Sequence, residues 1–134
     1  MTRRPANPTR DEAIQLGVEA IRQISYPDPA RASDAFEVMA ARAFDRAYDP
    51  AGFRRQLLAI IADGSRVDML KRIKVPTLVV HGKADRLVPW QCSEDIARHI
   101  TGARFELIDE MAHDLPPSQV DRMVELIAGH AAAH

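Results

Sequence analysis

The first half of the chain carries apolar residues at the three- and four-residue spacing of amphipathic helices. Thr9 and Glu12 match a capping box, and the apolar pattern behind them predicts a first helix from 9 to about 25. In Asp28-Pro29 an N-cap residue precedes a proline suited to the first helical position. A second helix is therefore expected to begin there and to continue through the apolar residues that follow.

A third helix and a short fourth one are expected before the pattern changes. Asp49-Pro50 repeats the combination of N-cap residue and proline, and Asp63-Gly64 ends the periodicity that follows it. One more capped turn is expected between 65 and 70, so this whole region is predicted to be helical. The residues expected to form the buried stripe of the third helix are Phe53, Leu57, Ile60 and Ile61.

From Val75 the pattern becomes that of alternating strands and helices. The run 76–81 is short and almost continuously apolar, as expected of a parallel strand covered on both faces. In a second strand Phe105 and Leu107 alternate with charged residues, which indicates one wetter face and a place near the sheet edge. A helix is expected after each strand. The core face of the last helix is expected to contain Val120, Met123, Val124, Ile127 and Ala128.

These patterns divide the chain into three parts. Residues 1–8 are rich in proline and polar side chains and are expected to be a disordered lead-in. Residues 9–74 form a helical segment, and residues 75–134 form a β-α-β-α unit. The predicted fold class is therefore α/β, with a helical N-terminal segment beside a minimal parallel sheet.

Composition narrows the classes of partner and cofactor. The 134 residues suffice for one domain, and a net charge of -1 gives no electrostatic footprint for nucleic acid or an anionic membrane. The single cysteine, Cys92, excludes an intrachain disulfide, and no Cys/His pair has the spacing of a structural zinc site. No apolar stretch follows the basic N-terminus as in a signal peptide. A cytoplasmic protein without metal, cofactor, nucleic-acid or membrane partner is expected.

Asp85 and His113 are the candidate catalytic residues. Each is expected in a loop just past the C-terminal end of a parallel strand, where open α/β sheets place their chemistry. A single loop aspartate or histidine is more often a helix cap or a backbone partner. Two neighbouring strands bring both loops together, however, so the Asp85 carboxylate is expected within 2.6 to 3.2 Å of His113 Nδ1, about the reach of a hydrogen bond. This arrangement leaves Nε2 as a general base.

Four further residues near these loops are expected to be structural. His81 ends a strand, where a histidine commonly satisfies backbone groups. Cys92 and Trp90 lie early on the next helix, where a buried, inert thiol and a packing indole are expected. Asp114 stands beside His113, but adjacent side chains in an extended loop tend to point apart, which leaves it little influence on the imidazole.

With these loops the chain resembles the α/β-hydrolase superfamily, in particular the C-terminal half of small bacterial esterase-like members. The run His81 to Pro89 resembles the family's acid loop, and the run Met111 to Pro116 resembles its histidine loop. The helices within 43–61 resemble the cap region that shapes the acyl or alcohol pocket. The resemblance implies a partial α/β-hydrolase fold in which Asp85 and His113 are the acid and base of a Ser-His-Asp triad.

The nucleophile of such a triad is not found in this sequence. Attack requires a serine on a tight elbow, Gly-x-Ser-x-Gly. No serine here has glycine at both flanking offsets: Ser25, Ser33, Ser65, Ser93 and Ser118. By the resemblance, the early strands, the oxyanion-hole loop and the elbow are expected before Met1. Ala112 also stands where a glycine commonly precedes the histidine, which is a mild change.

Two functions from different classes follow. The first is a carboxylic-ester-hydrolase-like segment that is inactive alone and acts when a complementary N-terminal hydrolase segment supplies the serine. The second is a non-catalytic, truncated hydrolase that serves as an oligomeric interaction module. Because the strand at 76–81 would lack one neighbour, its exposed edge is expected to drive homo-oligomer formation.

Overall fold

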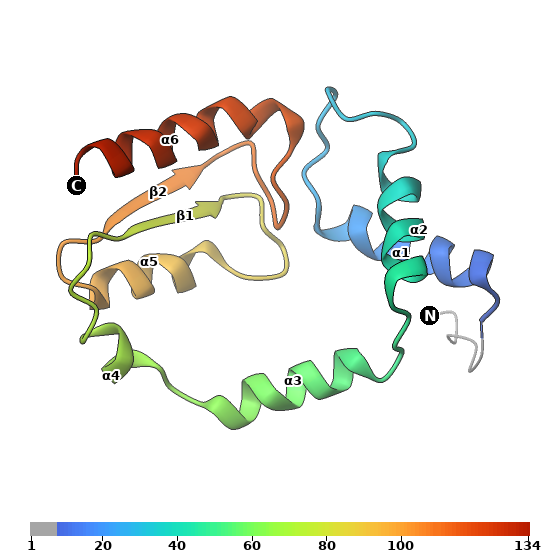
Figure 1. Ribbon diagram of the computed structural model, residues 1–134, viewed down its shortest axis with the longest axis horizontal. Coiled ribbons are helices and arrows are strands. Elements are labelled where there is room, and N and C mark those ends of the chain that lie inside the picture. Colours follow the sequence, from blue (N-terminus) through green and yellow to red (C-terminus); the bar gives the residue numbers. More distant parts are fainter. Residues whose placement is uncertain (1–7) are drawn as a thin grey trace.

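The computed structural model describes residues 8–134, so the expected lead-in at 1–8 lies outside the described residues apart from Pro8. Figure 1 shows a pair of crossed helices at one end, a small sheet between two helices at the other, and a long helical connection between these parts. The elements in chain order are α1 (Arg10–Ile24), α2 (Ala35–Arg46), α3 (Gly52–Asp63), α4 (Val67–Leu70), β1 (Leu78–Gly82), α5 (Trp90–His99), β2 (Arg104–Ile108), η1 (Pro117–Gln119) and α6 (Val120–Ala132).

α1 and α2 pack against each other as an independent helical layer. The predicted capping box is confirmed: Thr9 N–H donates to the Glu12 carboxylate at 2.7 Å, and Glu12 N–H donates to Thr9 Oγ1 at 3.3 Å. The helices approach so closely that a Cβ on Gly17 would lie 3.2 Å from Ala40 Cβ. Their shared core contains the buried residues Ile14, Val18 and Ala40, flanked by Ile21, Phe36, Ala41 and Phe44.

The second helix begins later than the sequence pattern predicts. α2 starts at Ala35, and the expected N-cap, Asp28, lies in the linker that precedes it. The Asp28 carboxylate is buried and accepts hydrogen bonds from Ala30 N–H at 2.9 Å and from Ser118 N–H at 2.8 Å. The predicted start of the second helix was wrong. The Asp28 carboxylate does not cap a helix, because it accepts a hydrogen bond from Ser118, 90 residues further along the chain.

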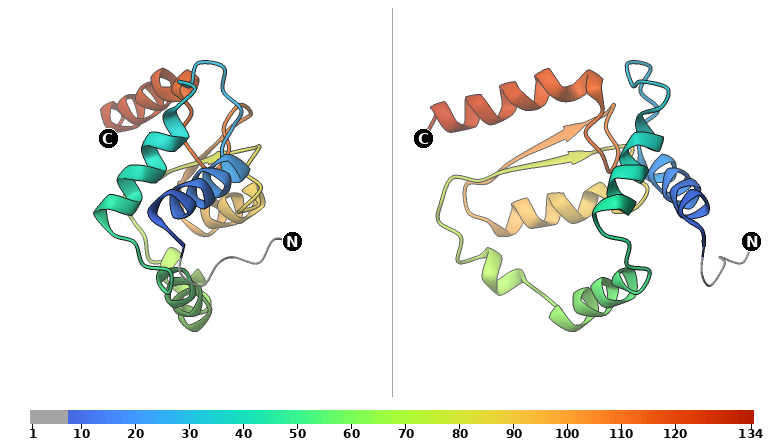
Figure 2. Two further views of the ribbon diagram at one scale, coloured as in Figure 1. Left: turned by 90° about the vertical axis from the view of Figure 1, so that its right-hand side faces the viewer. Right: turned by 45° about the vertical axis from the view of Figure 1, so that its right-hand side comes forward.

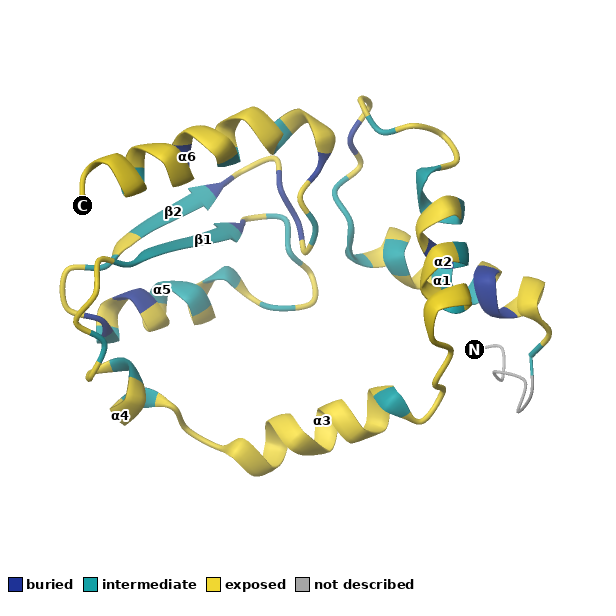
Figure 3. Ribbon diagram, viewed as in Figure 1, coloured by how far each residue is buried: buried dark blue, intermediate teal, exposed yellow. Residues whose placement is uncertain are grey.

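α3 has no buried residue, which corrects the expected buried stripe. Its large apolar side chains are exposed: Phe53, Leu57, Leu58, Ile60 and Ile61. Figure 3 shows the helix exposed along almost its whole length, and Figure 2 shows that it stands away from the sheet in other views too. The apolar pattern is present, but no element of the described chain covers it.

The sheet contains two parallel strands among the described residues, with β1 paired to β2 in the register of Leu78 with Arg104. α5 lies on one face of the sheet and α6 on the other, as Figures 1 and 2 agree. This β-α-β-α arrangement beside the helical layer confirms the predicted α/β class. Neither strand is paired along its outer edge within 8–134.

The core under α6 differs from the predicted one. Leu126 packs with Ile108 and Met111, and Met123 lies beside this cluster. Of the predicted core face only Met123 faces inward, whereas Val120, Val124 and Ile127 are exposed. The helix has apolar residues on two faces, so periodicity alone selected the wrong one.

Within 8–134, no helix has both the length and the apolar content of a membrane span.

Candidate active site

Asp85 lies in the loop after β1, and hydrogen bonds fix its carboxylate. Oδ1 accepts from the N–H groups of Leu87 at 2.8 Å and Val88 at 3.0 Å, while Oδ2 faces His113. The Asp85 side chain is only 3% exposed. Burial acts to raise the pKa of Asp85, but the hydrogen bonds from Val88, His113 and Leu87 outweigh it, and the pKa lies below its ordinary value. The carboxylate is therefore ionised at neutral pH.

His113 follows β2 and meets Asp85 across the sheet end. Its Nδ1 lies 2.9 Å from Asp85 Oδ2, which is the contact expected from the sequence. An ionised carboxylate can only accept, so Nδ1 carries the proton and donates it to Asp85. Nε2 then has a free lone pair, and the His113 side chain is 40% exposed. The pair combines a buried anion with an accessible base.

Gly82 allows the two loops to come this close. A Cβ on Gly82 would lie 2.4 Å from the carbonyl oxygens of both Met111 and Ala112. The loops are also joined by backbone hydrogen bonds, from Lys83 N–H to Ile108 O at 2.8 Å and from Ala84 N–H to Met111 O at 3.0 Å. Only glycine leaves room for this approach. The backbone thus sets the distance between the acid and the base.

His81, near the end of β1, holds the acid loop through both nitrogens of its ring. Its Nε2 lies 3.0 Å from Val88 O and its Nδ1 lies 2.7 Å from Ser93 Oγ. Because a carbonyl oxygen can only accept, Nε2 donates to Val88 and Nδ1 accepts from the serine hydroxyl. His81 Nε2 also approaches Asp85 Oδ2 at 3.4 Å. The backbone contact expected of this histidine is present. The contacts with Ser93 and Asp85 were not anticipated, since no sequence pattern indicates them.

Asp114 points away from the imidazole and toward the helical layer. Its carboxylate accepts from Tyr26 N–H at 2.9 Å and from Arg31 Nη2 at 2.5 Å. The Arg31 guanidinium in turn lies over the Phe36 ring, 4.9 Å from its centroid. The side chain was predicted to point away from His113, but its partners 83 to 88 residues earlier in the chain carry no signal in the sequence.

Two more hydrogen bonds join the end of α1 and the α1–α2 linker, residues 25–34, to the histidine loop, residues 109–116, and to Ser118 just beyond it. His113 N–H donates to Ile24 O at 3.0 Å, at the last residue of α1. Ser118 N–H, just after the loop, donates to Asp28 Oδ2 at 2.8 Å. The hydrogen bond from Ser118 is the main cause that lowers the pKa of Asp28 despite its desolvation. The candidate base is therefore attached to the helical layer as well as to the sheet.

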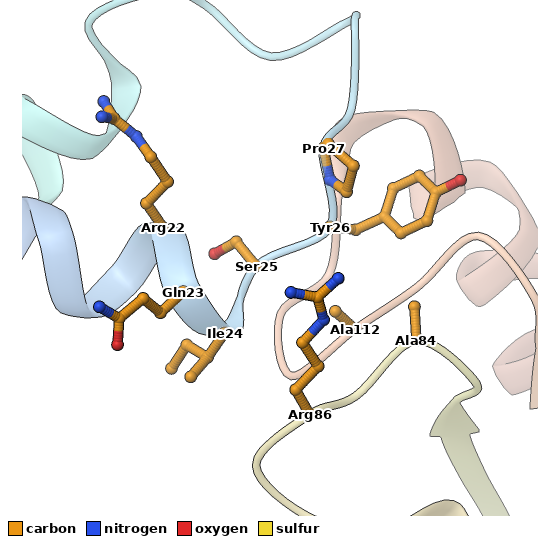
Figure 4. A pocket seen from close by; sticks show the side chains of 9 residues that line it. All are labelled: Arg22, Gln23, Ile24, Ser25, Tyr26, Pro27, Ala84, Arg86 and Ala112. Carbon is orange, nitrogen blue, oxygen red and sulfur yellow. The ribbon is translucent and has the colours of Figure 1, made fainter.

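Two cavities adjoin the pair. One of about 300 Å³ is lined by Asp85 and His113 together with Leu115 and Met123. The other, of about 330 Å³, lies between the acid loop and the α1–α2 linker. Figure 4 shows the Arg86 side chain pointing toward the linker, whereas the side chain of Arg22 on α1 points away from it. The first cavity lies at the ends of the strands beside α6, and the second lies where the helical layer meets the acid loop.

The remaining candidate side chains form no further centre. Cys92 is exposed, so the expectation of a buried thiol was wrong: in the first turn of α5 the neighbouring Ser93, not Cys92, is turned toward the acid loop and contacts His81. Within 8–134, no cluster of three or more His, Cys, Asp or Glu side chains has the arrangement of a metal site.

Comparison with known proteins identifies the class. Over 96% of its length the chain superposes on a variant of the meta-cleavage product hydrolase CumD, with a TM-score of 0.63 and 17% identity, and it covers 47% of that structure. A serine hydrolase involved in carbazole degradation (CarC) gives a TM-score of 0.57 at 19% identity, covering 90% of this chain and 47% of that one. The fold is thus that of part of an α/β hydrolase.

Sequence comparison places the chain in a family within this class. Residues 18–117 match the family described as serine aminopeptidase, S33, and the protein belongs to that family. The human serine hydrolase BPHL is 40% identical over 47 residues, which are 35% of this chain and 16% of the relative. The rat monoacylglycerol lipase ABHD6 is 24% identical over 84 residues, 60% of this chain and 25% of that enzyme. The chain spans about half the length of the solved hydrolases and a smaller share of these relatives.

Proposed function

We propose that Asp85 and His113 are the acid and base of a Ser-His-Asp triad that hydrolyses carboxylic esters. One observation carries this proposal: a buried, ionised carboxylate holds Nδ1 of a half-exposed imidazole at 2.9 Å. That hydrogen bond selects the tautomer in which Nε2 accepts a proton. Membership in a hydrolase family and the adjoining cavity support the same role.

The serine of this triad is proposed to come from a complementary hydrolase segment outside these 134 residues. No Gly-x-Ser-x-Gly elbow occurs in the sequence, and no serine among the described residues hydrogen-bonds to His113. The segment would dock on the unpaired edge of β1 and beside the exposed apolar face of α3. Both surfaces offer what a further parallel strand and its helices require: free backbone groups and uncovered apolar area.

In the assembled site the proton moves through His113. Nε2 accepts the proton of the serine hydroxyl as its oxygen bonds to the ester carbonyl carbon, and Asp85 stabilises the resulting imidazolium. The imidazolium then returns the proton to the departing alcohol, leaving an acyl-serine. In the second half of the reaction, water attacks the acyl carbon while Nε2 accepts a proton from that water. The imidazolium then returns the proton to the serine oxygen, and the carboxylic acid is released. The oxyanion donors would come with the complementary segment.

Labelling with a fluorophosphonate tests this proposal, because the reagent reacts with a serine activated by such a base. We would isolate the affinity-tagged 134-residue chain from its native cells, then measure labelling and hydrolysis of p-nitrophenyl butyrate. The expected result is a co-purifying polypeptide with a labelled serine. In His113→Gln and Asp85→Asn the polypeptide still co-purifies, but ester turnover falls about 10³-fold or more. The control His99→Gln alters a half-buried histidine of α5 that lies outside the histidine loop, and it keeps full labelling.

Three results would contradict the proposal. If labelling of the co-purifying serine is unchanged in His113→Gln, then His113 is not its base. If the purified chain alone hydrolyses the ester and loses this activity in His113→Ala, then the nucleophile lies within these 134 residues. A chain that is inactive alone and recruits no labelled serine also rejects the catalytic role.

We propose self-association as a second candidate, because the same surfaces suit another copy of the chain. Two β1 edges can pair about a two-fold axis, and two α3 helices can cover each other's apolar side chains. The protein would then be a non-catalytic, oligomeric interaction module. Light scattering at low micromolar concentration should give a dimer mass, which the change Ile60→Glu on α3 should reduce. A strictly monomeric mass with cooperative unfolding would reject this candidate.

A further inference from the structure

The histidine loop is held on two sides by different parts of the protein. On the sheet side, Ala84 N–H donates to Met111 O, and Gly82 leaves room for this approach. On the other side, Ile24 O at the end of α1 and two linker groups, Tyr26 N–H and the Arg31 side chain, contact the loop. The Asp28 carboxylate of the linker accepts from Ser118 N–H just after the loop. The sheet-side contacts fix where the loop begins, whereas the linker contacts fix the residues around and after the imidazole.

Arg31 is the side chain that makes this linker contact firm. The Arg31 and Asp114 side chains are only 11% and 18% exposed, and their charged groups are 2.5 Å apart. Arg31 Nε has no hydrogen-bond partner among the described groups, so Asp114 and the face of Phe36 hold the guanidinium. Phe36 belongs to the core shared by α1 and α2. A continuous series of contacts therefore leads from that core to the residue next to His113.

We propose that Arg31 is a positioning residue for His113. Through its ion pair with Asp114, it holds the loop backbone at the angle that keeps Nδ1 on Asp85 Oδ2. Its importance for catalysis rests on the proposed function, but the positioning itself does not. The geometry gives the ion pair this effect: His113 N–H is anchored on Ile24 O, and the carboxylate of the next residue, Asp114, is held by Arg31 Nη2 as well as by Tyr26 N–H, so the backbone on both sides of the imidazole is fixed.

The alternative is that the ion pair only stabilises the attachment of the linker. A part-buried ion pair supports the fold wherever it occurs, and loss of one partner is costly in either case. The two roles differ in what happens to the imidazole. If the pair only stabilises the fold, its removal lowers the melting temperature but leaves the His113–Asp85 hydrogen bond unchanged. If the pair positions the imidazole, its removal also weakens that hydrogen bond.

Nitrogen-15 NMR of the imidazole in the isolated chain separates these roles, since it reports which ring nitrogen carries the proton. In the wild-type chain His113 should show a single tautomer protonated at Nδ1. Arg31→Met and Asp114→Asn should each reduce the Nδ1–H signal at least about twofold, because the ring becomes free to exchange tautomers. Arg31→Lys should retain most of the signal, since one charged donor suffices for the single contact to Asp114.

A matched control comes from a surface pair of the same type. Arg98→Met removes an ion pair with Glu94 at 2.8 Å on α5 and should leave the His113 signal unchanged. Circular dichroism confirms that each variant is folded. If Arg31→Met fails to fold, the isosteric Asp114→Asn decides the question alone. A folded Asp114→Asn chain with a wild-type His113 spectrum would overturn the proposal.

The spectrum requires no nucleophile, so it answers independently of the labelling experiment. A positive NMR result together with failed labelling would reject the hydrolase function and keep the positioning. Successful labelling together with an unchanged spectrum would do the reverse. Where both succeed, Arg31→Met should lower turnover by the complex although the His113 side chain itself has not been substituted.

Discussion

α1 and α3 are amphipathic helices with the same number of large apolar residues, five each, but opposite surroundings. α1 buries its apolar face against α2, where Ile14 is 8% exposed. In α3, Ile60 is 66% exposed and no side chain is buried. The difference does not lie in the helices themselves. It lies in whether the described chain supplies a second surface at the right place.

This comparison separates two properties that sequence patterns combine. Periodicity shows which face of a helix is suited to burial, because it depends only on the spacing of apolar residues. Whether that face is buried depends on the rest of the fold. α3 is therefore best understood as half of an interface, and this interpretation predicts how the two helices differ in experiment.

Hydrogen exchange should show the largest contrast. α3 has twelve residues, a length at which a helix without tertiary contacts is marginal in water. Its amides should exchange close to the unprotected rate, whereas those facing α2 in α1 should be protected at least about 100-fold more strongly. Exchange read by mass spectrometry or NMR checks this. Equal protection would mean that α3 is already covered, for instance by a second copy, and dilution would then reveal it.

A matched pair of substitutions should give the next largest difference. Ile14→Ala opens a cavity in the core of α1 and α2 and should cost about 2 to 4 kcal/mol of unfolding free energy. Ile60→Ala removes the same atoms from an exposed site and should cost less than about 0.5 kcal/mol. Urea denaturation measures both. Ile60→Ala should also weaken the binding of the complementary segment. If that binding is unchanged, α3 is not part of the interface.

Capping should show a smaller contrast in the same direction. Thr9→Ala removes the capping box of α1 and should destabilise the protein by about 1 kcal/mol. Asp49→Ala removes the side chain that accepts from Ala51 and Gly52 N–H at the start of α3. It should reduce the helix signal in circular dichroism without moving the main thermal transition. A shift of that transition by Asp49→Ala as large as that of Thr9→Ala would contradict the separation of the two helices.

The smallest contrast concerns acid. Hydrogen bonding to Arg10 lowers the pKa of Asp45 below its ordinary 3.8, and hydrogen bonding to Arg55 does the same for Asp49. Such stabilisation is complete above the ordinary pKa and is lost as the pH falls through the lower folded-state pKa. Of these two aspartates, Asp45 joins α2 to α1 through Arg10, whereas Asp49 contacts Arg55 within its own region of the chain. Asp45→Asn should therefore flatten the fall in melting temperature below about pH 4, and Asp49→Asn should leave it unchanged.

The parts of the fold that could be predicted from the sequence are those set by neighbours in the chain. The capping box at Thr9, the two strands and the proximity of Asp85 to His113 follow from local pattern and from the way parallel strands align their ends. The catalytic role of the pair stays a prediction. What failed depends on distant partners: Asp28 was assigned to a local cap, but its carboxylate binds Ser118.

The site shows the same division. Position 82 needs glycine because the carbonyl groups of a loop 29 residues later in the chain lie against it. The residues around Gly82 in the sequence do not indicate this contact. Likewise, Arg31 and Asp114 look like ordinary surface charges in the sequence and meet only because the linker crosses the histidine loop. The prediction of the buried face of α6 failed for a different reason. The helix has apolar residues on two faces, and the spacing of apolar residues does not show which of them is buried.

The bonds between the α1–α2 linker and the histidine loop also constrain the order of folding. They connect residues 83 to 90 positions apart, so their loop-closure entropy must be overcome before they contribute any stability. α1 and α2 precede the strands in the chain and can pair locally, but Arg31 lacks its ion-pair partner Asp114 until the loop after β2 is in place. His113 is thus set in place at the last step, and a chain stalled before that step would hold an assembled sheet and helix pair with an unpositioned base.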